Sequence, residues 1–138
     1  MLPLIPEGYQ KSTVNILEKE RFDYWRDLIC DEFVKLDCEA VENGSFNGEI
    51  RGGVGVSSLR FSEVISDPQL VRRSKQQISK SAEEDFLISF QLTQQGLVRQ
   101  DGREAVLKPG YFALYDSTRP YTLTFKEHFH QFIVQMPK

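Results

Sequence analysis

Residues 96–121 read GLVRQDGREAVLKPGYFALYDSTRPY, and this stretch decides the expected fold. Short apolar runs alternate in it with Asp101-Gly102, Pro109-Gly110 and Arg119-Pro120. Each of these pairs signals a turn, because glycine adopts positive φ without strain and proline fixes φ at the value that turns need. Turns at such short intervals predict strands that fold back on one another. The stretch is therefore typical of a small antiparallel β-barrel.

The surrounding sequence extends this pattern of strands. Asp101-Gly102 favours a two-residue type I′ hairpin, since both central residues of that turn need positive φ. From residue 86 to residue 93 the side chains alternate between two faces, which predicts a strand with one face in the core. The expected strands are residues 86–93, 97–100, 103–107, 111–115, 121–125 and 129–136. Short strands at near-regular spacing after one long helix predict a mainly β protein, either a barrel or a two-sheet jelly roll.

The region before the strands predicts an amphipathic helix at residues 20–36. Its apolar residues recur at steps of three and four, at Phe22, Trp25, Ile29, Phe33 and Leu36. We interpret Trp25 as a core anchor and not as a ligand contact. The 138 residues suffice for one domain, in which the helix at about 20–36 precedes a barrel at about 45–137.

Composition and charge limit the classes of function. Hydrophobic residues make up 40% and charged residues 27% of the chain, which is typical of a globular protein. A net charge of -3 argues against direct binding of a nucleic-acid backbone, because that binding rests on clustered lysine and arginine. The N-terminus lacks a leader pattern, and no apolar run approaches the length of a membrane span. We therefore expect a cytoplasmic protein with no membrane partner.

The two cysteines are expected to be reduced thiols. Cys30 and Cys38 lie in or just after the predicted helix, where eight helical residues would separate their Cα atoms by roughly 12 Å. That separation is beyond the reach of a disulfide.

Arg60 is a candidate for binding an anionic ligand. In an extended segment it shares one face with Val54, Val56 and Ser58. If that face points into the barrel, Arg60 needs an acidic partner or an anionic ligand, because an unpaired buried charge is costly. The alternative is that the face is solvated, or that Arg60 lies at the barrel mouth with its head in water. The basic stretch at residues 71–77 is interpreted as a solvated connection, because acidic residues balance it nearby.

His128 and His130 are the only histidines, and they lie on one face of the last predicted strand. Two imidazoles at i and i+2 can share a metal, but a third ligand would have to come from Glu127, Glu104 or Asp116. A His-x-His pair alone is a weak signal, so we expect no metal and no cofactor. The sequence has neither a nucleophile elbow nor a phosphate-binding loop, so we do not expect an enzyme.

The chain resembles the effector-binding domain of AraC-type bacterial transcription regulators, which has a cupin-like barrel. The resemblance covers residues 25–137 and is strongest from residue 86 onward. It rests on the joint order of four motifs, which are Arg72-Arg73-Ser74, residues 100–105 (QDGREA), Pro109-Gly110 and residues 115–121 (YDSTRPY). Tyr111 departs from the family, which usually has an acidic residue after Pro-Gly.

Regulators of this family bind a small molecule in the barrel, dimerise, and control DNA through a C-terminal pair of helix-turn-helix motifs. The resemblance therefore implies a small-molecule effector and a homodimer. It implies contact with DNA only through a C-terminal domain, which we expect to lie outside these 138 residues. Two alternatives stay open, a metal-dependent cupin enzyme with an atypical ligand set and a stand-alone cupin that works by protein association.

An effector pocket would be mostly apolar, with one or two polar groups that set the orientation of the ligand. By strand parity and side-chain chemistry, the candidate ligand-binding residues are Arg60, Phe90, Gln100, Tyr115 and Tyr121. Parity does not say which face of a strand is inward, and a shift by one residue inverts every assignment. Asp116 and Arg119 are expected to form an ion pair that braces the turn before Pro120 and so fixes Tyr115 and Tyr121 at the barrel mouth.

Overall fold

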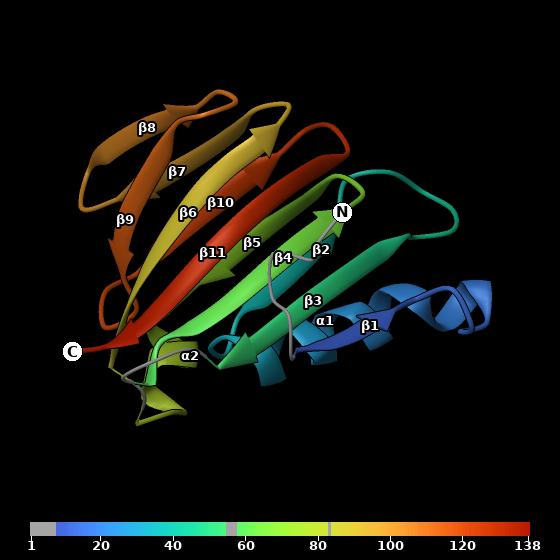
Figure 1. Ribbon diagram of the computed structural model, residues 1–138, viewed down its shortest axis with the longest axis horizontal. Coiled ribbons are helices and arrows are strands. Elements are labelled where there is room, and N and C mark those ends of the chain that lie inside the picture. Colours follow the sequence, from blue (N-terminus) through green and yellow to red (C-terminus); the bar gives the residue numbers. More distant parts are fainter. Residues whose placement is uncertain (1–7, 55–57, 83) are drawn as a thin grey trace.

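The computed structural model describes residues 8–54, 58–82 and 84–138, and in them the strands form two antiparallel sheets (Figure 1). Sheet A has six strands in the order β1-β3-β4-β11-β6-β9. Their bounds are β1 (Tyr9–Ser12), β3 (Gly48–Val54), β4 (Arg60–Ser66), β6 (Asp85–Thr93), β9 (Phe112–Asp116) and β11 (Phe129–Pro137). Sheet B has five strands in the order β2-β5-β10-β7-β8. Their bounds are β2 (Asp37–Ala40), β5 (Gln69–Arg73), β7 (Gly96–Gln100), β8 (Arg103–Leu107) and β10 (Tyr121–Phe125).

The prediction of a mainly β protein with an N-terminal helix is confirmed, in its two-sheet form. The hairpin between β7 and β8 turns at Asp101 and Gly102, whose φ values of 56° and 73° are both positive, as a type I′ turn requires. The predicted strands at residues 103–107 and 121–125 coincide with β8 and β10. Turn residues thus placed the C-terminal strands to within one or two residues.

The helical elements are a short 3-10 turn, η1 (Glu18–Glu20), and two helices, α1 (Arg21–Glu32) and α2 (Lys75–Ser79). Helix α1 buries Trp25, Leu28 and Ile29 against the sandwich. The helix predicted at residues 20–36 was too long. Helix α1 ends at Glu32, and the next residue, Phe33, has the non-helical angles φ -114° and ψ -101°. Phe33 and Val34 are both buried, whereas consecutive residues of a helix would point about 100° apart. In the described residues, no helix is long and apolar enough to span a membrane.

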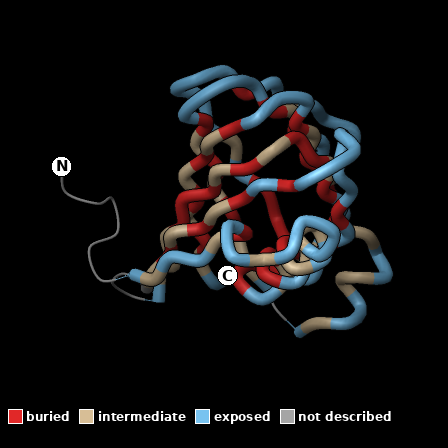
Figure 2. Tube along the Cα trace, turned by 90° about the vertical axis from the view of Figure 1, so that its right-hand side faces the viewer, coloured by how far each residue is buried: buried red, intermediate tan, exposed pale blue. Residues whose placement is uncertain are grey.

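The core lies between the two sheets and is built from alternate residues of each strand. In Figure 2 the buried residues recur along the strands, whereas many connecting turns are exposed. In β6 the buried side chains are Leu87, Ser89 and Gln91. The polar ones are paired, since Ser89 Oγ lies 2.6 Å from Tyr115 Oη and Gln131 donates to Gln91 Oε1 at 2.8 Å. Hydrogen bonds of this kind make polar side chains acceptable in a core.

The outer face of sheet A consequently carries a row of aromatic side chains, although the apolar side of β6 was expected to face the core. Four phenyl rings lie side by side on four neighbouring strands, and we call this set the aromatic face: Phe61, Phe132, Phe90 and Phe112. Ring centroids along it are 6.1, 6.4 and 5.4 Å apart. Phe112 and its neighbour Leu114 are 62% and 60% exposed.

The interpretation of residues 71–77 as a solvated connection was wrong for Arg73, which is buried. It ends β5 and is completely buried. Its guanidinium donates to the backbone carbonyls of Ser117 at 3.0 Å, Lys35 at 2.8 Å and Gln77 at 3.4 Å. Arg73 therefore joins the turn after β9 to the segment after α1 and to α2. Net charge along the chain could not show this, because the acceptors are main-chain groups far away in sequence.

Candidate functional site

The main candidate site is an open cleft where the edge strands β8 and β9 of the two sheets lie next to each other. Its volume is about 600 Å³, within the range of small-molecule sites. We call it the edge cleft, and its walls are the hairpin of β7 and β8, strand β9 and the turn after β9. In Figure 1 this region lies at the opposite end of the molecule from α1.

The floor of the edge cleft is apolar and is made of small side chains. Val98 of β7, Ala105 of β8 and Ala113 of β9 line it, and the two alanines also pack against the hydrophobic core. Period two along β8 puts Ala105 on the same inner side as the buried Leu107. Because alanine projects only one methyl group, these two edge strands leave room between them.

Gln100 lines the edge cleft, but its side chain holds the turn after β9. Its Nε2 donates to the carbonyl oxygens of Asp116 at 2.7 Å and Arg119 at 3.1 Å. Its Oε1 accepts from the backbone N–H of Asp116 at 3.0 Å. Three bonds to main-chain groups fix the side chain, so in this structure Gln100 shapes the wall of the cleft.

The turn after β9 carries the expected ion pair. Arg119 Nη2 lies 3.5 Å from Asp116 Oδ2, and Arg119 also pairs with Asp101. Asp116 is buried, which opposes its ionisation, but hydrogen bonds from Lys138 and from the backbone and hydroxyl of Thr118 lower its pKa to about 2. Asp116 is therefore a carboxylate at neutral pH and holds the turn together.

Tyr115 connects the edge cleft to the interior. It lines the cleft and also a second, internal cavity of about 40 Å³ between the sheets. Tyr121 lines the same cavity, and the two rings lie 4.7 Å apart between centroids at 60° to each other. Burial raises the pKa of Tyr115 to about 12 and that of Tyr121 well above its ordinary value. Both hydroxyls are thus neutral and able to donate a hydrogen bond.

The internal cavity is small in this structure. Its walls are mainly apolar residues of both sheets and of the α1 region, with Gln69 and Gln131 as further polar groups. About 40 Å³ is room for water, whereas benzene is held by a cavity of about 150 Å³. A ligand of drug size therefore fits the edge cleft and not the interior.

Three of the five predicted ligand-binding residues thus come together, namely Gln100, Tyr115 and Tyr121, and two do not. The side chain of Arg60 is 41% exposed, as in the alternative with its head in water, and it lies 3.6 Å from the buried Glu32 of α1. Burial raises the pKa of Glu32 and the nearby Arg60 lowers it, with burial the larger effect. Val56, expected beside Arg60 on one strand face, lies outside the described residues.

Phe90 belongs to the aromatic face, so its assignment to the pocket interior is corrected. In β6 its neighbours Ser89 and Gln91 are buried, and Phe90 therefore points to the other side of sheet A. The apolar character of Phe90 was read correctly, but the inward face of the strand was not.

The two histidines lie apart from the cleft and have separate acidic partners. His128 Nδ1 is 3.0 Å from Asp67 Oδ1, and His130 Nε2 is 2.8 Å from Glu63 Oε1. Among the residues that the structure describes, no group of three histidine, cysteine or acidic side chains is placed to hold a metal ion. Cys30 and Cys38 are free thiols.

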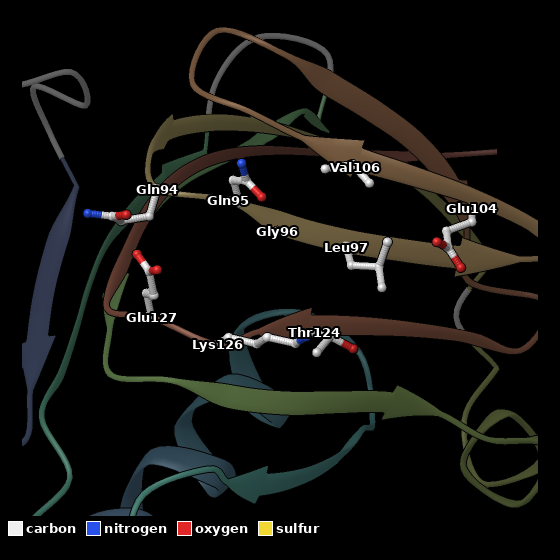
Figure 3. Close-up of a pocket in the computed structure, with 9 residues that line it drawn as sticks. All are labelled: Gln94, Gln95, Gly96, Leu97, Glu104, Val106, Thr124, Lys126 and Glu127. Carbon is white, nitrogen blue, oxygen red and sulfur yellow. The ribbon is translucent and has the colours of Figure 1, made fainter.

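A second surface hollow, of about 400 Å³, lies on the outer side of sheet B (Figure 3). Leu97 from β7, Val106 from β8 and Thr124 from β10 project into it, with Glu104 and Lys126 nearby. This hollow shares none of the five predicted ligand-binding residues and does not reach the interior. We therefore regard the edge cleft as the stronger candidate.

Sequence reasoning missed Ala105, Ala113 and Arg103, which all line the edge cleft. The sequence did contain a signal for the cleft. Ala105 and Ala113 are small residues in two consecutive predicted strands whose other apolar residues are large. Small residues in paired strands indicate a gap only when the strands are known to face each other. That fact came from the sheet order.

Comparisons with known proteins point to one family. The model of the AraC-binding-like domain matches residues 25–138. An uncharacterised protein encoded in the nit 5′ region of Bacillus sp. (strain OxB-1) is 48% identical over 126 residues, which are 91% of this chain and 48% of that protein. The transcriptional activator NphR of Rhodococcus sp. is 32% identical over 87 residues, which are 63% of this chain and 26% of NphR.

Among solved structures, the AraC-like transcriptional activator CuxR superposes with a TM-score of 0.81 at 16% identity, over 95% of this chain and 47% of CuxR. At that identity the likeness concerns the fold, which is a cupin-like pair of sheets. The chain spans about half the length of CuxR and of the Bacillus relative, and about a quarter of NphR.

Proposed function

Since this chain belongs to the AraC-binding-like domain family, we propose that it is the effector-binding part of an AraC-type transcription regulator and that a small organic molecule binds in the edge cleft. Contact with DNA would then be made by another part of a longer protein. The relatives NphR and CuxR, which are named as transcriptional activators, are longer than this chain and so have room for such a part.

The observation that carries the proposal is the convergence of family motifs on one hollow. The motif at residues 100–105 supplies Gln100, Arg103 and Ala105 to the edge cleft, and the motif at residues 115–121 supplies Tyr115 and Arg119. These motifs carry the resemblance to the family, and both lie at the same opening. An apolar floor with a few polar groups at its rim is the usual composition of a small-molecule site.

Binding can be tested through the alanine methyl groups, because the chain has four alanines and two of them line the edge cleft. In the protein labelled with ¹³C at alanine methyls, we expect some members of a library of small acids, amides and alcohols to shift the signals of Ala105 and Ala113. The signals of Ala40 and Ala82, which are exposed elsewhere, should stay in place.

A cleft-filling substitution gives the control. Ala113→Leu is expected to weaken binding of the hits at least 10-fold, because the larger side chain occupies the floor of the cleft. Val106→Leu, in the hollow on the outer side of sheet B, should leave binding unchanged. The proposal would be contradicted if the hits bind the Ala113→Leu variant with the same affinity as the unaltered protein. It would also be contradicted if no member of the library shifts the signals of Ala105 and Ala113.

We further propose that the domain forms a homodimer through the aromatic face. The four rings of this face are apolar, and a second copy rotated by two-fold symmetry would present the same rings to them. Four strands about 4.8 Å apart and roughly six residues long give roughly 400 Å² of flat sheet. That is about half of the ~800 Å² that each partner buries in a stable complex, so weak association is expected.

A further inference from the structure

We infer that the edge cleft takes a small monocarboxylate, whose carboxylate pairs with Arg103 and whose apolar body lies over Ala105, Ala113 and Tyr115. This inference rests on the proposed function and adds the chemical class of the ligand. It starts from the charges at the rim of the cleft.

Four charged side chains line the edge cleft, and in the described part of the chain only one of them has no partner of opposite charge. Arg119 pairs with Asp101 and lies 3.5 Å from Asp116, while Glu104 is 2.7 Å from Arg99. Arg103 makes no ion pair with any described residue. Its guanidinium is thus available to an anion from outside.

Arg103 is an exposed residue at the rim of the edge cleft, on the same side of β8 as the floor of the cleft. It is opposite Gln100 in the β7–β8 pair and two residues before Ala105. Because side chains alternate along a strand, Arg103 shares the inner side of sheet B with Ala105 and Leu107. Arg99 and Glu104 project from the other side and neutralise each other there. Arginine binds a planar carboxylate through two parallel hydrogen bonds, which suits this arrangement.

Because Arg103 is the one cation at the cleft without an acidic partner among the described residues, one negative charge on the ligand is expected. A dianion such as a phosphate monoester would bring a second charge close to Asp101, which lines the same cleft. The rest of the ligand meets the methyl groups of Ala105 and Ala113 and the buried ring of Tyr115, whose hydroxyl is paired with Ser89 in the core. A body without polar groups therefore matches the floor, since unpaired polar groups buried there would cost binding free energy.

Comparing each carboxylate with its primary amide separates the effect of the ligand's charge from the effect of its shape. Four carboxylates with different bodies, namely benzoate, cyclohexanecarboxylate, 2-naphthoate and hexanoate, are titrated against the ¹³C-alanine protein beside their primary amides. We expect the tightest acid to bind about 10- to 100-fold more tightly than its amide, which is the range of a charge-assisted hydrogen bond. Arg103→Gln should remove most of that difference, and Arg99→Gln should preserve it.

The outcomes separate this inference from the proposed function. Amides that bind as tightly as the acids do would overturn the carboxylate class and leave the site standing. An Arg103→Gln protein that still prefers acids would overturn Arg103 as the partner of the carboxylate. If neither acids nor amides shift these two methyl signals but another member of the library does, the inference fails and the site stands. If nothing in the library shifts them, both fail. Arg103 is exposed, so its substitution should not disturb folding, and an unchanged melting temperature checks this.

Discussion

Single residues in this protein act mainly through main-chain partners that are distant in sequence. Gln100 holds the backbone of Asp116 and Arg119, and Arg73 holds three carbonyl groups from three segments. Asp116 differs from these two, because its carboxylate binds the neighbouring Thr118 and the side chains of Arg119 and Lys138. The turn that borders the edge cleft is therefore fixed by a few buried polar groups.

The low pKa of Asp116 predicts how its contribution depends on pH. In the folded protein this pKa is about 2, below the ordinary value of 3.8, so the carboxylate stabilises the fold above about pH 4 and the effect is lost as the pH falls toward 2. Asp116→Asn should lower the free energy of unfolding by about 1–2 kcal/mol at pH 7 and by little at pH 2. Urea unfolding at several pH values measures this, and an equal loss at all pH values would contradict it.

At the scale of elements, two positions require glycine for different reasons, one because of its backbone angle and one because of the space available. Gly102 has φ of 73° in the β7–β8 turn, and a Cβ added there would meet nothing within 4 Å. Gly48 in β3 has no such φ, but an ideal Cβ would lie 2.5 Å from Cε3 of Trp25. The ring of Trp25 is completely buried, so α1 packs directly on this part of sheet A.

We therefore expect Gly48→Ala to be the more destabilising of the two substitutions. It should cost about 2–3 kcal/mol, because the fully packed Trp25 ring has to shift. Gly102→Ala should cost about 1 kcal/mol through the left-handed backbone alone. Urea unfolding of both variants provides the measurement. A Gly48→Ala protein as stable as Gly102→Ala would show that α1 accommodates the added methyl group without loss.

At the scale of the whole molecule, the two ends of the sandwich and its outer faces have different roles. Helix α1 closes one end, the edge cleft opens at the other, and the aromatic face covers the outside of sheet A. The cleft and the aromatic face share β9, where Ala113 and Tyr115 line the cleft and Phe112 belongs to the aromatic face. If a second copy binds the aromatic face, the dimer contact and the cleft use adjacent residues of one strand.

The proposed dimer predicts a concentration-dependent molar mass. Sedimentation equilibrium should show a monomer at micromolar concentration and a dimer fraction that grows toward millimolar concentration. The double substitution Phe112→Ser and Leu114→Ser should abolish that growth, because both exposed side chains lie on the buried side of the contact. Val106→Ser, at a residue that is 48% exposed on the other sheet, is the matched control. A monomer at every concentration would rule out the dimer.

Much of the fold followed from local sequence, because turns are decided by the residues within them. Asp101-Gly102 and Pro109-Gly110 located the C-terminal strands, and the spacing of Trp25 and Ile29 located α1. The motifs at residues 100–105 and 115–121 also indicated the part of the chain that forms the edge cleft. These features depend on neighbours a few residues apart.

Which strand face lies inside was decided only by the tertiary structure. In β6 the side with Phe90 is more apolar than the side with Ser89 and Gln91, yet the polar side is buried because Tyr115 and Gln131 satisfy it. Period two along a strand defines two faces but not their direction, which depends on the partners brought by other strands. For the same reason the sequence could name Gln100 and Tyr115, but it took the order of the sheets to bring Ala105 and Ala113 together and to leave Arg103 without a partner among the described residues.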